Sequence, residues 1–213
     1  MIQLNDIQAF GYGLSLYSPD ILVEFLKAEN CKARKLCSYF DKHKDVYYKA
    51  ISTGVLLPVY RICAFKYAIF ISINETDIAP PDGWEQVFKY DDFFIQVGSS
   101  NKLCWMSFDD MEENKESVDK RATTDCRIIP HGSKLIMLPV YFAVDIDIPQ
   151  GNYRFDLTGY KRVVSLDESL QENYGRNYAY GYAFRSTDIT DNENMDKDNE
   201  KLQYDIHNFL RAK

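Results

Sequence analysis

The spacing of hydrophobic positions changes along the chain from a helical period to an alternating one. Near the N-terminus, Ser18, Pro19 and Asp20 are typical of a helix start, because serine caps, proline suits the first turn, and a carboxylate favours the positive end of the helix dipole. An apolar stripe at helical spacing follows, at Ile21, Leu22, Phe25 and Leu26. This pattern predicts a first helix.

A second helix is predicted over residues 32–51. Its apolar face recurs in steps of four and three residues, at Leu36, Phe40, His43, Tyr47 and Ala50. Gly54 is expected to end it, since glycine adopts the left-handed conformation common after a helix.

From residue 63 the apolar period becomes two, which predicts strands. One strand is expected over residues 63–73, followed by the turn "APPDGW" and by strands in 85–98 and 101–108, joined by "GSSN". Residues 126–164 predict three more strands, separated by "PHG" and "PQGN".

Strands bracketed by helices predict one α+β domain over residues 1–213, with a mostly antiparallel β-sheet that is sandwich-like or strongly curved. We expect a helical part at 18–52, a β-rich body at 55–186, an acidic linker at 187–200 and a C-terminal helix at 200–211.

Composition agrees with a β-rich core, because apolar residues make up 46% of the chain and it holds 16 tyrosines and 13 phenylalanines. The 5 cysteines are odd in number and unpaired in spacing, which favours a reducing compartment. No signal peptide pattern opens the chain, and the longest apolar run contains Arg61 and Lys66. These features predict a cytoplasmic protein with no membrane span.

The net charge of −7 is unevenly distributed. Residues 109–125 hold seven acids and three bases, and residues 188–200 hold six acids and one base. Residues 31–49 instead hold six lysines or arginines and two aspartates. The chain is therefore predicted to have two acidic segments and one basic helix, and its overall acidity argues against nucleic acid as a partner.

The stretch "NYAYGYAFRS" places Tyr178, Tyr180 and Tyr182 on one side of a predicted strand, with small residues on the other. The tyrosines fit two interpretations. They pack as part of a strand, or they form an exposed ledge that binds a partner with large, rigid side chains.

The sequence gives little support for a catalytic site. A nucleophile needs a nearby base, and Cys104 with His131 is the pair available, without a supporting motif. His43 lies on an apolar helix face and His207 on the closing helix. Neither Cys31 with Cys37 nor Cys126 with His131 has a second ligand pair, so no metal or cofactor is predicted.

Acidic and aromatic residues form the predicted binding surface. In "PVYFAVDIDI", strict alternation places Asp145 and Asp147 on a solvent-facing side, together with Tyr141 and Ala143. Acidic surfaces with tyrosines bind basic proteins by electrostatic steering and aromatic contacts. The full set of predicted contact residues is Tyr141, Asp145, Asp147, Asp109, Asp110, Glu112, Glu113, Tyr178, Tyr180 and Tyr182.

The small acidic chain, the strand–turn–strand "IPQGNYRFDLTGYKRV" and the aromatic-acidic strand "VYFAVDIDI" resemble features of bacterial immunity proteins. These proteins are cytosolic inhibitors of polymorphic or contact-delivered toxins. The resemblance covers about residues 55–164, and the basic helix departs from it. It implies a non-catalytic module that binds a toxin domain, such as a basic nuclease.

Two other classes stay open on the sequence. One is a hydrolase-like enzyme that uses Cys104 or a histidine, and the other is a structural subunit of a larger assembly. A cleft with perturbed titratable groups favours the enzyme, and an extended apolar patch favours the subunit.

Overall fold

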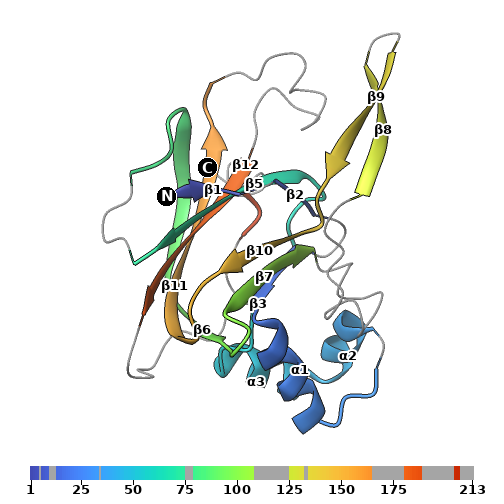
Figure 1. Ribbon diagram of the computed structural model, residues 1–213, viewed down its shortest axis with the longest axis vertical. Helices are drawn as coiled ribbons and strands as arrows, with labels where there is room; N and C mark the ends of the chain where they lie inside the picture. Colours follow the sequence, from blue (N-terminus) through green and yellow to red (C-terminus); the bar gives the residue numbers. More distant parts are fainter. Residues whose placement is uncertain are drawn as a thin grey trace.

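A four-stranded β-sheet lies between a six-stranded sheet and a layer of helices (Figure 1). The computed structural model describes residues 1–4, 6–9, 13–33, 35–74, 79–107, 125–131, 134–164, 180–188 and 204–206. The predicted α+β class with mainly antiparallel sheets is confirmed.

The six-stranded sheet has the order β1-β5-β12-β11-β6, with β2 also pairing with β5. Its strands are β1 (Ile2–Gln3), β2 (Ile7–Gln8), β5 (Lys66–Ile73), β6 (Trp84–Val97), β11 (Gly151–Arg162) and β12 (Tyr180–Asp188). Every pair in this sheet is antiparallel except β5 with β12, which run parallel.

The four-stranded sheet has the order β10-β7-β3-β4 and is antiparallel throughout. Its strands are β3 (Gly13–Tyr17), β4 (Leu56–Tyr60), β7 (Lys102–Ser107) and β10 (Ala143–Asp147). A separate hairpin pairs β8 (Asp125–His131) with β9 (Lys134–Val140). Residues 126–164 therefore contain four strands and not the predicted three, because the chain leaves the hairpin at Tyr141 and enters the four-stranded sheet as β10.

The two sheets share one hydrophobic core, which makes the body a sandwich. Trp105 of β7 and Phe184 of β12 meet across it, with ring centroids 4.1 Å apart and ring planes tilted by 63°. The four-stranded sheet contributes Leu14, Leu16, Leu57, Val59, Trp105 and Val144, and the six-stranded sheet contributes Ile69, Ile71, Phe88, Phe155, Tyr182 and Phe184.

The helices cover the opposite face of the four-stranded sheet. They are α1 (Pro19–Ala28), α2 (Leu36–Lys42) and α3 (Lys44–Ser52). Their buried side chains, such as Leu22, Phe40 and Ala50, form a second core with Cys104 and Met106 of β7. The four-stranded sheet is thus covered on both faces.

The predicted single helix over 32–51 is wrong, because it breaks at His43 into α2 and α3. Apart from His43, the predicted apolar face is confirmed. Its other members are buried: Leu36, Phe40, Tyr47 and Ala50. His43 is exposed, as are all residues from 41 to 45. Helices gain most of their stability from packing, so the exposed middle turn is the weakest part of a helix over 32–51 and the place where it breaks.

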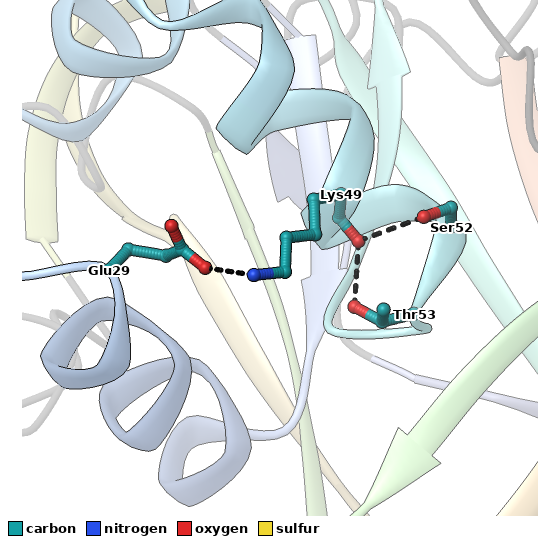
Figure 2. A network of polar contacts seen from close by, with 4 residues as sticks. All are labelled: Glu29, Lys49, Ser52 and Thr53. Carbon is teal, nitrogen blue, oxygen red and sulfur yellow. Dashed lines mark hydrogen bonds and ion pairs between the residues drawn. The ribbon is translucent and has the colours of Figure 1, made fainter.

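A polar network links the ends of α1 and α3 (Figure 2). The Lys49 ammonium forms an ion pair with Glu29, and the Lys49 carbonyl accepts hydrogen bonds from Ser52 (3.2 Å) and Thr53 (2.7 Å). Gly54 follows with φ +71° and donates its N–H to the Ile51 carbonyl at 3.0 Å. Gly54 therefore ends α3 as predicted.

The tyrosines of β12 are interior. Tyr182 is 0% exposed and Tyr180 is 8% exposed. The Tyr182 hydroxyl donates a hydrogen bond of 2.6 Å to the Tyr204 carbonyl. Their predicted use as partner contacts is therefore wrong, because both rings face the core between the sheets; the packing interpretation matches their burial. Tyr178 lies outside the described residues.

The last predicted elements are covered only in part. β12 extends to Asp188, into the predicted linker at 187–200, and the rest of that linker lies outside the described residues. Of the predicted C-terminal helix, only 204–206 are described, and all three are buried. Among the described residues, no helix has the length and apolar character needed to cross a membrane.

Replacing Tyr182 by Ala should lower the free energy of unfolding by about 3–5 kcal/mol, because the change leaves a cavity between the sheets. Tyr182→Phe should cost about 1 kcal/mol through the lost hydrogen bond to Tyr204. Urea unfolding followed by circular dichroism measures both. The control is Tyr48→Ala, since Tyr48 is 40% exposed. Equal small losses at positions 48 and 182 would contradict a core role for Tyr182.

Candidate protein-binding surface

Strand β10 lies at the edge of the four-stranded sheet and carries the two aspartates singled out from the sequence. Val144 (8% exposed) and Ile146 (4% exposed) face the core between the sheets, as the alternation predicted. Asp145 is half-buried and Asp147 is exposed. The solvent-facing prediction therefore holds for Asp147, whereas the Asp145 side chain is only 28% exposed. It is wrong for Ala143, which is buried against the helices.

Lys102 of the neighbouring strand β7 lies between the two carboxylates. Its ammonium is 3.7 Å from a carboxylate oxygen of Asp145 and 3.7 Å from one of Asp147. The strand register explains this arrangement, because Lys102 is directly opposite Asp147 and diagonal to Asp145. The three groups carry a net charge of −1, and the Asp147 side chain is 88% exposed. Solvent-exposed pairs of this length contribute little to stability.

Tyr141 lies just before β10, where the chain passes from the hairpin to the sheet. It is half-buried, and its backbone carbonyl accepts a hydrogen bond of 2.8 Å from the N–H of Gln8. A parallel bridge joins Ile7 to Tyr141. The segment that leads into the acidic edge is thus attached to β2.

A turn held by Asp20 positions the other end of this edge. The Asp20 carboxylate accepts hydrogen bonds from the hydroxyl of Ser18 (2.7 Å), the hydroxyl of Ser99 (3.2 Å), and the N–H and hydroxyl of Ser100 (both 2.9 Å). The Ser18 hydroxyl accepts from the N–H of Gly98 at 3.0 Å. A Cβ on Gly98 would lie 2.3 Å from an Asp20 oxygen, so a larger residue there would displace the Asp20 carboxylate.

Asn101 links this turn to the segment that follows β10. Its backbone has φ +53°, a conformation that asparagine tolerates well. Its carbonyl accepts from the N–H of Ile148 at 3.1 Å, and its side-chain oxygen accepts from the N–H of Gln150 at 2.8 Å. The chain immediately after Asp147 is therefore fixed to the turn that Asp20 holds.

The sequence identified Ser18 and Asp20 as helix-start residues but not as parts of this network. The Ser18 side chain makes no capping hydrogen bond; its partners are the Asp20 carboxylate, the Gly98 N–H and the Lys102 carbonyl. The serines in "GSSN" were the available signal, since hydroxyls next to a turn are natural donors to a carboxylate. Nothing local in the sequence links that turn to residue 20.

The hydrogen bonds at Asp20 change its acidity. Burial acts to raise the pKa of this carboxyl, but the hydrogen bonds from Ser18 and Ser100 outweigh it and lower the pKa from 3.8 to about 2. Asp20 therefore stays ionised across the physiological range and keeps the turn in place.

The remaining predicted contact residues do not join this edge. Asp109, Asp110, Glu112 and Glu113 lie outside the described residues, as does Tyr178. The candidate site is therefore reduced to Tyr141, Asp145 and Asp147, with Lys102 as a member that the sequence reasoning missed. The alternating pattern of β7 placed Lys102 at a strand start, but only the register with β10 shows its proximity to the aspartates.

The candidate nucleophile Cys104 is 0% exposed in the core between the helices and the sheet, so a substrate cannot reach its thiol. His43 is exposed and contacts the Tyr39 ring, and His207 lies outside the described residues. Within the described ranges, no cluster of three or more histidine, cysteine, aspartate or glutamate side chains is arranged to hold a metal ion.

Neither a protein-family model nor a curated protein matches this sequence. Among solved structures, the chain is similar to a protein described as "Crocagin biosynthetic gene J". The two are 10% identical, the match covers 86% of this chain and 98% of that one, and the TM-score is 0.38. A likeness of this size carries no argument about function.

Asp20→Asn should lower the free energy of unfolding at neutral pH by about 1 kcal/mol, a figure kept small because the carboxylate is partly exposed. Since the folded pKa is about 2 and the ordinary value is 3.8, the contribution is complete above about pH 4 and is lost as the pH falls through about 2.

Urea unfolding of the wild type and the variant at pH 7, 4 and 2 measures this dependence. Glu24→Gln, an exposed change in the same helix, is the control for lost charge. If the difference in unfolding free energy between wild type and Asp20→Asn stays constant from pH 7 to pH 2, the ionised Asp20 carboxylate is not the source of the stabilisation.

Proposed function

We propose that this chain is a non-catalytic protein-binding module that acts as an immunity protein, binding and neutralising a toxin domain with a basic surface. The observation that carries the proposal is the placement of Asp145 and Asp147 on an edge strand, where they share Lys102. The class-level resemblance to immunity proteins supports the same assignment.

The charges of this edge favour a cationic partner. The Lys102 ammonium lies 3.7 Å from a carboxylate oxygen of Asp147, which marks a weak ion pair. A lysine or arginine of a partner can therefore approach Asp147 without breaking a strong interaction. The net charge of −7 adds a long-range attraction for a basic domain. Charge complementarity of this kind raises association rates and suppresses wrong partners.

Packing and hydrogen bonds hold the backbone of the edge in place. Val144 and Ile146 are held in the core, and the Asp20 turn fixes the chain after Asp147 through Asn101. A partner therefore meets carboxylates whose backbone is already ordered, which reduces the entropy lost on binding. Charged side chains on an edge strand also oppose pairing with a second copy of the sheet.

The first experiment identifies the partner. The tagged chain is used for affinity capture from the cytosol of its own organism and from toxin-exposed cells, and the captured proteins are identified by mass spectrometry. We expect one stoichiometric basic protein whose toxicity the chain suppresses. Capture of no protein under both conditions would count against the proposal and favour an enzyme.

With that partner, the double variant Asp145→Asn/Asp147→Asn should slow association about tenfold at low salt, because it removes the steering charges. The free energy of unfolding should change by less than about 0.5 kcal/mol, since exposed pairs stabilise little. Surface plasmon resonance at two salt concentrations and urea unfolding measure the two effects.

The matched control is Asp82→Asn/Glu85→Gln, which removes the same charge from exposed positions next to and within β6. Equal slowing by both double variants would show a general charge effect and no site at β10. A large loss of stability in the Asp145/Asp147 variant would show that the two aspartates are structural.

A further inference from the structure

The outward face of α2 presents a set of polar and aromatic side chains at helical spacing. Leu36 and Phe40 of this helix are buried against the four-stranded sheet. Positions separated by three, four, seven and eight residues lie on one face of a helix. The opposite face of α2 and its two caps therefore carries Lys35, Ser38, Tyr39, Lys42 and His43.

These five side chains, with Ala33 from the preceding segment, line a hollow of about 500 Å³. That volume is in the range of small-molecule sites in proteins. The hollow belongs to the helical layer and shares no residue with the acidic edge at β10.

One wall of the hollow is aromatic. The rings of Tyr39 and His43 are in contact in a tilted arrangement, with centroids 4.5 Å apart and planes inclined by 33°. Tyr39 is half-buried, so its ring is held by the neighbouring core, and His43 is exposed at the break between α2 and α3. A flat ring of a ligand can pack against this pair.

The rim of the hollow is cationic. Lys35 and Lys42 are exposed, and neither forms an ion pair within the described part of the chain. Of the neighbouring carboxylates, Asp41 pairs with Lys44 at 3.0 Å, Glu29 pairs with Lys49, and Asp45 is exposed to solvent. The charge of the two rim lysines is therefore available to an anion.

The Tyr39 hydroxyl adds a donor. Burial raises the pKa of Tyr39, and the nearby Cys31, Glu29 and Asp45 raise it further. The hydroxyl thus stays protonated at neutral pH and can donate a hydrogen bond. The two rim lysines are seven residues apart, about 10 Å along the helix, and their long side chains can approach one ligand from both ends.

We propose that this hollow binds a small anionic molecule with an aromatic ring, of the nucleoside phosphate class. The ring stacks on the Tyr39–His43 pair, and Lys35 and Lys42 bind the phosphate. This site goes beyond the proposed immunity function and uses a different element of the fold. Because the hollow is open to solvent, we expect a dissociation constant on the order of 0.1–1 mM.

Titration of the full chain with adenosine 5′-monophosphate, followed by amide NMR spectra, tests the proposal. The expected result is saturable shifts at α2, weaker by about tenfold or more in Lys35→Gln/Lys42→Gln. Adenosine alone and inorganic phosphate alone should each bind less tightly than the nucleotide. Tyr39→Leu, which keeps an apolar side chain against the core, should also weaken nucleotide binding.

The matched control is Lys66→Gln/Lys161→Gln, which removes the same charge from β5 and β11 of the six-stranded sheet. No shifts at α2, or equal binding by both double variants, would overturn the proposal. Binding of a single-stranded RNA oligonucleotide at the hollow ten times tighter than the mononucleotide would overturn it in favour of nucleic acid. None of these results depends on Asp145 or Asp147, so they are separate from the test of the immunity function.

Discussion

The contact between the inner faces of the two sheets is the constraint on which the rest of the structure depends. Trp105 and Phe184 meet there, from strands that are far apart in the sequence. Because the helices cover the other face, the four-stranded sheet is buried on both sides. Such a sheet can present charged side chains only where this cover ends. That is why the outward-facing carboxylates of this sheet lie on its edge strand, β10.

The same constraint explains how the acidic edge is held. An edge strand has one neighbour, so the position of β10 depends on β7 and on the turns at its ends. Asp20 supplies the missing support from the start of α1, through the serines of the 98–101 turn and then through Asn101. A residue with a local role in the helix thus positions a surface formed by strands more than 80 residues later in the chain.

The two proposed sites lie on surfaces of opposite charge. The edge at β10 carries net negative charge, which suits a basic protein. The hollow on α2 carries net positive charge around an aromatic pair, which suits a small anion. The hollow lies in the basic segment 31–49, whereas the edge at β10 lies outside both acidic segments of the chain. Because the negative edge and the positive hollow lie on different layers of the fold, their electrostatic potentials do not cancel each other.

The sequence by itself determined the class of fold, the start of α1, the end of α3 at Gly54 and the alternation of β10, since each depends on neighbouring residues and on the period of the pattern. Tertiary structure decided the rest. The periodicity of residues 32–51 is continuous, yet the helix breaks at His43, where residues 41 to 45 are all exposed. The alternation that places Asp145 and Asp147 on one face of β10 also places Tyr180 and Tyr182 on one face of β12, but whether a face is covered depends on which sheet packs against it. The Lys102–Asp145–Asp147 cluster and the Asp20 turn likewise arise from strand register and from contacts between distant segments. These are properties of the folded chain, because pairing partners are selected by the packing of the whole sheet and not by the residues of one strand.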